Sequence, residues 1–153
     1  VVDALGPVIG QLGLDVSDRQ TDLGLRLDAL DAEVRAMIDT IPAERRKLVT
    51  GHESMGYFAD EYDLALVGAV LPSLSSAGEV SAQELAAISQ KIRDEGVTVI
   101  FTEIGTPQSV VDAIAGETGV RVVALPSHNL PADGSYETFI RDIAALVTTS
   151  LIG

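Results

Sequence analysis

The chain has 153 residues, of which 23 are acidic and 10 are basic, and its net charge is −13. This charge argues against nucleic acid and an anionic membrane surface as partners, because both attract a basic protein surface. Cysteine is absent, which rules out disulfides, thiolate metal sites and a cysteine nucleophile.

The first predicted elements are helical. Residues 1–20 indicate part of a helix followed by a polar turn at 15–18. A long helix comes next and ends at Pro42, because proline disfavours the helical conformation in the residue before it. Its buried face is predicted from apolar side chains at helical spacing: Leu27, Leu30, Val34, Ile38 and Ile41. A long leading helix outside the sheet often ties one lobe of a protein to another, and we assign residues 1–46 to such a linking region.

Four short runs after this region are continuously apolar. They comprise residues 47–50, 64–70, 97–102 and 121–125. Strands of a parallel sheet that is covered on both faces have this pattern, whereas half-exposed strands alternate. Helical segments separate the runs. We therefore predict an α/β fold: a small open sandwich with a four-stranded parallel sheet flanked by helices, preceded by the long linking helix.

Local signals mark the ends of the helices between the strands. A capping box begins one helix at Ser81, and that helix ends near Gly96. Thr106 is predicted to cap the next helix, with Pro107 at its first position. The last helix begins near residue 134, and its inward-facing side chains are predicted to be Tyr136, Phe139, Ile143 and Leu146.

The two histidines of the chain both follow predicted strands. His52 ends the apolar run that starts at Lys47, and His128 lies just past the run that starts at Arg121. Ligands in open α/β sheets bind at the carboxyl ends of the parallel strands. Two imidazoles that different strands deliver to one edge are half of a transition-metal site, although a single histidine there is more often structural. We therefore predict that His52 and His128 are metal ligands.

Glu103 ends the third predicted strand and faces the same edge. Three roles are open to a carboxylate there: a further metal ligand, an acceptor that orients a histidine N–H, or a cap of the following helix. We favour the orienting role and expect Glu103 to lie within reach of the two imidazoles.

A small serine hydrolase is an alternative function. The segment from Gly51 to Gly56 resembles the strand-to-helix turn that presents a nucleophilic serine, although Ser54 is displaced by one residue. Ser54, Asp112 and His128 stand in the chain order of a catalytic triad. Four strands are too few for the hydrolase sheet, however, and no glycine cluster for an oxyanion loop precedes the turn. We therefore favour metal binding.

Several segments occur together in the order found in one protein family. They are residues 41–52, 56–59 with Tyr62, 78–82, 101–103, 117–119 and 134–136. On these segments, which run from about Leu27 to the C-terminus, the chain resembles the TroA-like (cluster A-I) solute-binding proteins of bacterial ABC importers for zinc and manganese. The ordered set is far more specific than any single motif.

The resemblance implies two α/β lobes joined by a long rigid helix, with a metal ion between them and two ligands from each lobe. This chain resembles the helix plus the C-terminal lobe, residues 47–153, with the N-terminal lobe missing. His52 matches the third ligand of the family. His128 stands at the position of the fourth ligand, which is usually an aspartate, and Gly51 stands where serine is common.

The resemblance also implies the function. We expect an extracytoplasmic protein, periplasmic or lipid-anchored as a lipoprotein at the bacterial cell surface. It captures a divalent metal ion and passes it to a membrane ABC permease, and it is not an enzyme. Two nitrogen donors favour zinc over manganese. Two alternatives stay open: an interaction module that keeps the fold without the ion, and a homodimer that completes the site.

Overall fold

The computed structural model describes residues 2–13, 15–71 and 81–153. In these residues the chain forms α1 (Val2–Gly10), α2 (Ser17–Ile38), β1 (Lys47–Thr50), α3 (Gly56–Glu61), β2 (Ala65–Ala69), α4 (Ala82–Glu95), β3 (Val99–Thr102), α5 (Gln108–Thr118), β4 (Arg121–Ala124) and α6 (Tyr136–Ile152). A short 3-10 turn, Ala43–Arg45, precedes β1. None of the described helices is long and apolar enough to span a membrane. Most of the family segment 78–82 lies outside the described residues.

The four strands form one parallel sheet in the order β2-β1-β3-β4. β1 pairs with both β2 and β3, and β3 pairs with β4. The predicted α/β fold with a four-stranded parallel sheet flanked by helices is therefore confirmed. Three of the strands are shorter than the apolar runs that predicted them, because Leu64, Val97 and Leu125 are buried in the core just beyond the strand ends.

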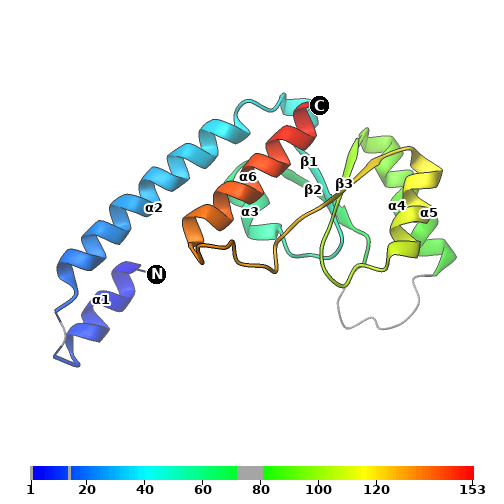
Figure 1. Ribbon diagram of the computed structural model, residues 1–153. Helices are drawn as coiled ribbons and strands as arrows, with labels where there is room; N and C mark the ends of the chain where they lie inside the picture. The colour runs from blue at the N-terminus through cyan, green and yellow to red at the C-terminus, as the bar shows by residue number, and fades with distance from the viewer. Residues whose placement is uncertain (1, 14, 72–80) are drawn as a thin grey trace.

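Helices cover both faces of the sheet, with α4 and α5 on one side and α2, α3 and α6 on the other (Figure 1). The strand residues Val49 and Ile100 belong to the apolar cluster on the α4 and α5 side. Their neighbours Leu48 and Val99 belong to the cluster on the opposite side. Successive side chains of a strand point to opposite faces, so a sheet covered twice needs apolar residues at every position. This explains the apolar runs of the two central strands, β1 and β3, whereas the edge strand β4 is mostly exposed despite its apolar run.

α2 is the long helix predicted from the sequence. It begins inside the predicted polar turn and ends at Ile38, before the expected stop at Pro42, and Ile41 is buried in the connection that follows. The C-terminal half of α2 packs on α6, with Val34 fully buried. The N-terminal half extends beyond the sheet, with α1 beside it (Figure 1), and there Leu25 is 67% exposed. Only half of the helix is therefore part of the core.

Two of the predicted helix starts have different outcomes. The capping box at Ser81 is present, and α4 ends at Gly96, which has the left-handed φ of 63°. The predicted cap of α5 is wrong, because Pro107 holds the capping position and no side chain caps the helix. The Thr106 hydroxyl instead accepts the backbone N–H of Glu103 at 3.4 Å. Thr106 therefore ties α5 to the end of β3.

The start of α6 also differs from the prediction. Ser135 caps the helix, and its hydroxyl accepts the backbone N–H of Thr138 at 3.3 Å. Tyr136 was expected to face inward, and this is wrong, because its side chain in the first turn is 56% exposed. Ile143, two turns later, is buried as predicted, and Phe139 is half-buried. The core of this layer begins one turn into the helix.

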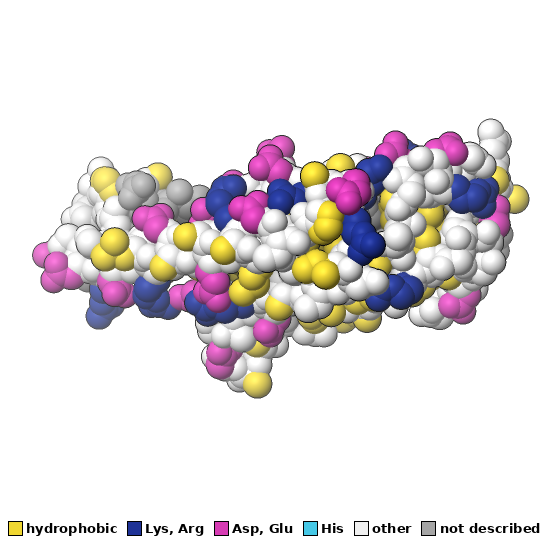
Figure 2. All heavy atoms as spheres, turned by 90° about the horizontal axis from the view of Figure 1, so that it is seen from above, with side chains coloured by type: hydrophobic (Ala, Val, Ile, Leu, Met, Phe, Trp, Pro, Cys, Tyr) yellow, Lys and Arg dark blue, Asp and Glu magenta, His cyan; other side chains and the backbone are white. Residues whose placement is uncertain are grey.

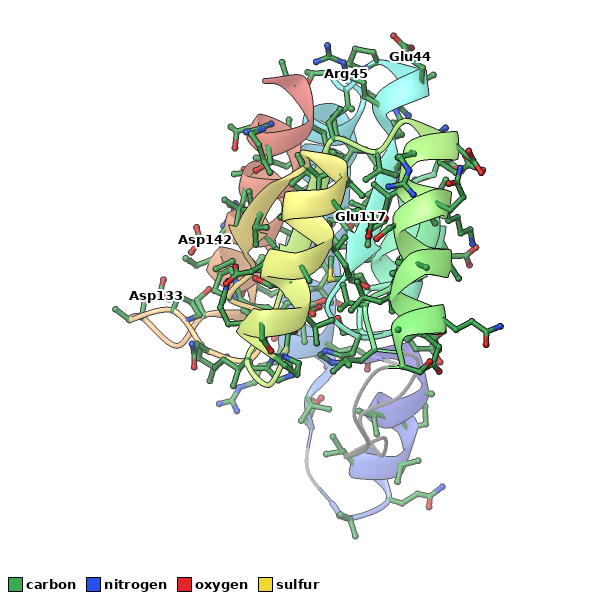
Figure 3. All side chains as sticks on the ribbon, turned by 90° about the vertical axis from the view of Figure 1, so that its right-hand side faces the viewer. Glu44, Arg45, Glu117, Asp133 and Asp142 are labelled. Atoms are coloured by element: carbon green, nitrogen blue, oxygen red, sulfur yellow. The ribbon has the colours of Figure 1, made fainter. Side chains whose placement is uncertain are left out.

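Basic side chains hold helix ends at the amino-terminal edge of the sheet. Arg45 donates to the carbonyl of Ile152 at 2.6 Å, and Figure 3 shows Arg45 beside the end of α6. Arg121 donates to the carbonyl of Ser150 at 2.5 Å, and Lys47 donates to the last carbonyl of α4 at 2.6 Å. Cations at helix C-termini complement the helix dipole and satisfy free carbonyls. Figure 2 looks onto this end of the molecule and shows scattered Lys and Arg side chains but no histidine.

Candidate metal centre

The strand order places a ligand-binding edge between β1 and β3. After β1 the chain crosses to β2 on one side, whereas β3 lies on the other side of β1. The carboxyl ends of β1 and β3 therefore form the topological switch point at which open α/β sheets bind ligands. His52 follows β1, Glu103 follows β3 and His128 follows β4, all at this edge.

Two imidazoles meet at this edge. The ring centroids of His52 and His128 are 5.4 Å apart, and the ring planes are tilted by 40°. His52 is buried, with 7% of its surface exposed, whereas His128 is exposed. The two rings lie side by side, as their positions after β1 and β4 led us to expect. One is held in the protein and the other faces solvent.

The carboxylate of Glu103 contacts the loop that carries His52. Its side chain is fully buried, and Oε2 lies 3.3 Å from Nδ1 of His52. The same oxygen accepts the backbone N–H of His52, also at 3.3 Å. The other oxygen, Oε1, accepts the hydroxyl of Ser54. Glu103 was expected near a histidine, but its bond to Ser54 was not.

Gly51 allows the loops after β1 and β3 to approach closely. A Cβ atom at this position would lie 2.1 Å from Oγ1 of Thr106 and 2.6 Å from Oε2 of Glu103. Both distances are too short for a real Cβ contact, so a side chain here forces a rearrangement. No local pattern in the sequence marks this contact, because it joins two loops that are far apart along the chain. Sequence reasoning therefore missed both Gly51 and Thr106 as parts of the site.

A groove of about 580 Å³ opens beside His128 and also includes Ser54. Its walls are mostly apolar side chains from α2, α3 and α6. Tyr62 lines the groove, and burial of its ring, together with the nearby carboxylates of Asp31 and Glu61, raises the pKa of Tyr62 to about 12. The phenol is therefore protonated at neutral pH and adds no negative charge to the groove.

The described residues contain no complete set of metal ligands. Within 2–13, 15–71 and 81–153, no three His, Asp or Glu side chains are arranged to hold a metal ion. The carboxylate of Glu103 is engaged by His52 and Ser54 and does not join the two imidazoles as a third donor. The structure brings two imidazoles together, His52 and His128, whereas a four-coordinate metal ion needs four donors.

The hydrolase triad considered above is not assembled. The hydroxyl of Ser54 donates to Glu103 instead of to an imidazole. Asp112 lies on the exposed side of α5, where its carboxylate accepts the side-chain amide of Gln108 at 2.8 Å. The Nδ1 atom of His128 faces the hydroxyl of its neighbour in the chain, at 3.0 Å. A general base needs hydrogen-bond reach of the nucleophile and a partner that orients it, and neither arrangement is present among these residues.

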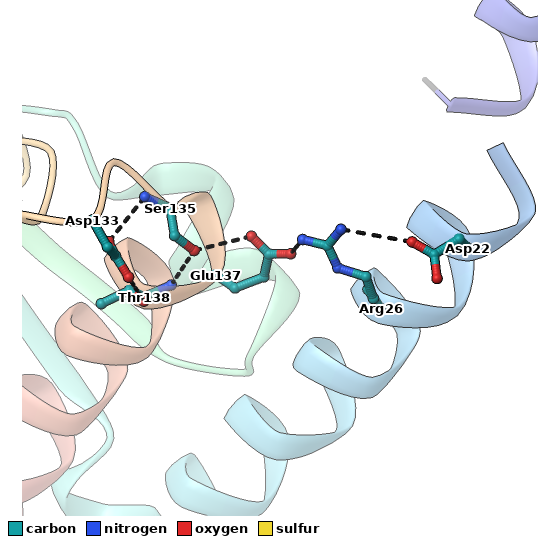
Figure 4. Close-up of polar contacts among 6 residues, drawn as sticks. All are labelled: Asp22, Arg26, Asp133, Ser135, Glu137 and Thr138. Atoms are coloured by element: carbon teal, nitrogen blue, oxygen red, sulfur yellow. Dashed lines mark hydrogen bonds and ion pairs between the residues drawn. The ribbon is translucent and has the colours of Figure 1, made fainter. Parts of the chain in front are cut away.

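An ionic network links α2 to the turn that follows the His128 loop (Figure 4). Arg26 of α2 pairs with Glu137 in the first turn of α6. The helix N–H of Glu137 and the Arg26 guanidinium hold the pKa of the Glu137 carboxyl below its usual value. The backbone N–H of Ser135 and the hydroxyl of Thr138 do the same for the pKa of Asp133. The long helix is therefore fixed to the segment that leads from His128 into α6.

Known metal-binding proteins resemble the chain in sequence and in structure. The zinc-binding protein TroA of Treponema pallidum is 38% identical over 89 residues, which is 58% of this chain and 28% of that protein. The solved structure of the periplasmic zinc binding protein TroA from Treponema pallidum has a TM-score of 0.77 at 25% identity, covering 99% of this chain and 58% of that chain. The solute-binding protein FpvC of Pseudomonas aeruginosa, solved in complex with Mn²⁺, shares the fold, with a TM-score of 0.73 at 24% identity over 98% of this chain and 56% of that chain.

The family assignment follows from the match along the chain. The chain spans less than two thirds of the length of each of these relatives. The family model described as zinc-uptake complex component A, periplasmic, matches residues 15–149, which include α2, the sheet and both histidines. This protein therefore belongs to the ZnuA family of periplasmic zinc-uptake components.

Proposed function

We propose that this chain is the linking helix and C-terminal lobe of a solute-binding protein that captures zinc for an ABC permease. The observation that carries the proposal is the pair of His52 and His128, with ring centroids 5.4 Å apart at the carboxyl edge of the sheet. In this proposal residues 1–46 form the linking region and 47–153 the metal-holding lobe. The location is extracytoplasmic, either the periplasm or, for a lipoprotein, the outer face of the cell membrane.

Zinc is favoured by the chemistry of the two donors. Imidazole nitrogen suits zinc, whereas manganese prefers carboxylate and water, and zinc outbinds manganese at most nitrogen sites. The fold itself does not decide the metal, since FpvC shares the fold and holds Mn²⁺. His52 and His128 leave two positions of a four-coordinate ion to water or to a second lobe. We therefore expect this chain alone to bind zinc more weakly than a closed structural site does.

Binding and release of the ion complete the proposed role, and no bond chemistry is involved. The net charge of −13 attracts cations to the protein from solution. An exposed His128 beside a buried His52 offers one donor that meets the incoming ion and one that is already held in place. Transfer to a permease then requires only that His52 and His128 release the ion.

Calorimetric titration with Zn²⁺ tests the proposal. We expect His52→Ala and His128→Ala each to weaken zinc binding strongly, and the double variant to abolish it. Asp142→Asn is the matched control, because this carboxylate projects from α6 into solvent and lies outside the site (Figure 3). This variant reports whether the loss of one surface carboxylate changes zinc binding, and we expect it to leave the affinity unchanged.

Three outcomes of this titration are decisive. Unchanged zinc binding in the double alanine variant contradicts the proposed site. Manganese that fills the site in an equal competition with zinc overturns the choice of metal. A stoichiometry of one zinc per two chains, with zinc-dependent dimers in sedimentation, assigns the two missing ligands to a homodimer instead of a second lobe.

A further inference from the structure

We propose that Glu103 is a positioning residue that fixes the tautomer of His52, so that the buried imidazole presents Nε2 to the ion. This inference rests on the proposed function, because it names how one ligand of that site is prepared. The carboxylate lies close to the imidazole, with Oε2 of Glu103 3.3 Å from Nδ1 of His52.

The donors around Oε2 determine which nitrogen of His52 carries the proton. A backbone N–H can only donate, and Oε2 accepts the backbone N–H of His52. Oε2 is therefore an acceptor, and an Nδ1 atom 3.3 Å from it is favourably placed only as an N–H. The neutral ring then has its lone pair on Nε2, which is the atom free to bind a metal. The opposite tautomer sets the lone pair of Nδ1 against a carboxylate oxygen and is disfavoured.

Three features keep the carboxylate in this place. The side chain of Glu103 is 0% exposed, so water does not compete for its oxygens. Ser54 donates to Oε1 and leaves Oε2 for His52. Gly51 has no Cβ atom in the space that Oε2 occupies. An orienting carboxylate behind a ligating histidine is a common way to raise ligand basicity and metal affinity.

His128 provides an internal comparison. Its Nδ1 atom lies 3.0 Å from the hydroxyl of Ser127, and the side chain is exposed. A hydroxyl both donates and accepts, so this contact is compatible with either tautomer. Glu103 thus prepares His52 alone, and Ser127 leaves His128 free to adopt the tautomer that the ion requires.

The test is the tautomer of His52 in metal-free protein, read from ¹⁵N chemical shifts of labelled histidine in a series that extends to about pH 8.5, well above the pKa of a free imidazole. We expect the proton on Nδ1 of His52 in the native chain. Glu103→Gln should keep this tautomer, because its amide oxygen still accepts the fixed backbone N–H and its NH₂ group can donate to Ser54. Glu103→Leu removes the acceptor, so the His52 signals should move to those of a mixture. Ser127→Ala should leave the His52 signals unchanged.

Zinc affinity provides the second measurement. We expect Glu103→Leu to weaken zinc binding roughly 10- to 100-fold, the range for an orienting partner of a metal ligand. Glu103→Gln should recover most of that loss. A proton on Nε2 of His52 in the native chain, or an unchanged His52 tautomer in folded Glu103→Leu protein, overturns the inference. If Glu103→Leu does not fold, a changed tautomer in Glu103→Gln overturns it instead. A native chain that shows the expected tautomer but binds no zinc contradicts the proposed function alone.

Discussion

Replacing Gly51 with alanine tests how tightly the loops after β1 and β3 are packed. The added Cβ atom is placed 2.1 Å from Oγ1 of Thr106 and 2.6 Å from Oε2 of Glu103. The Glu103 carboxylate is buried and bonded to Ser54, so it has little room to withdraw. The substitution therefore has to displace Thr106, the carboxylate or the β1 backbone.

The size of the effect follows from the overlap. Overpacking a closely packed site by one methyl group costs typically about 1–3 kcal/mol, and the overlap with Thr106 is severe. We expect Gly51→Ala to lower the free energy of unfolding by an amount in this range. The added Cβ atom crowds Oε2 of Glu103, the oxygen that contacts His52, so zinc binding should weaken together with stability.

Urea unfolding followed by circular dichroism measures the stability, and calorimetry measures the zinc affinity. Gly56→Ala, at the start of α3, is the matched control, because its Cβ atom would meet nothing within 4 Å. We expect that control to be neutral or slightly stabilising. Adding Thr106→Ala to Gly51→Ala removes the shortest overlap and should restore part of the loss, a coupling of roughly 0.5–3 kcal/mol. Native stability and affinity in Gly51→Ala would refute the close-packing argument.

Three further predictions concern stability. Ser89 is fully buried on α4 and its hydroxyl has no hydrogen-bond partner in the described structure, so Ser89→Ala should raise the unfolding free energy by roughly 1 kcal/mol; a lower urea midpoint would contradict this. Arg45→Met removes the bond to the end of α6, and calorimetric melting should show a loss of about 1 kcal/mol, or about 2–4 °C. Glu137 has a lowered pKa in the folded protein, so its contribution is present above the pKa of the unfolded chain and is lost as the pH falls through the folded pKa. The stability difference between Glu137→Gln and the native chain should therefore be largest near neutral pH and shrink in acid, and a difference that is constant across a pH series of thermal melts would exclude this origin.

The sheet and the positions of the two histidines followed from the sequence, because each rests on a local pattern with a general rule behind it. Apolar runs such as the one ending at Thr50 indicate a strand covered on both faces. A polar residue directly after such a strand lies at the carboxyl edge, where ligands bind. These rules placed His52 and His128 at one edge without any knowledge of the packing.

Contacts between distant segments did not follow from the sequence. Thr106 has the pattern of a helix cap, but its hydroxyl accepts the backbone N–H of Glu103 and does not cap α5. Tyr136 continues the apolar spacing of α6, yet the first turn lies outside the core and the ring is exposed. The direction of the Glu103 carboxylate depends on Gly51, which lies in the loop after another strand. In each case the position of the side chain is decided by tertiary packing, which leaves no signal in the neighbouring sequence.

The half-buried placement of α2 has a mechanical consequence. A helix of 22 residues is about 33 Å long. The C-terminal half of α2 is fixed in the core, whereas its N-terminal half extends beyond the sheet (Figure 1). Arg26, in the N-terminal half of α2, pairs with Glu137 of α6, so this ion pair also holds part of the half that extends beyond the sheet. The part of α2 from Arg26 to Ile38 is therefore held to the rest of the fold as one rigid unit. Gly24 lies in α2 two residues before Arg26, and the helix is expected to bend most easily there, because glycine weakens a helix interior. Bending is therefore expected just before the Arg26–Glu137 pair, so the carboxyl edge of the sheet keeps its shape when the first turns of α2 and α1 move.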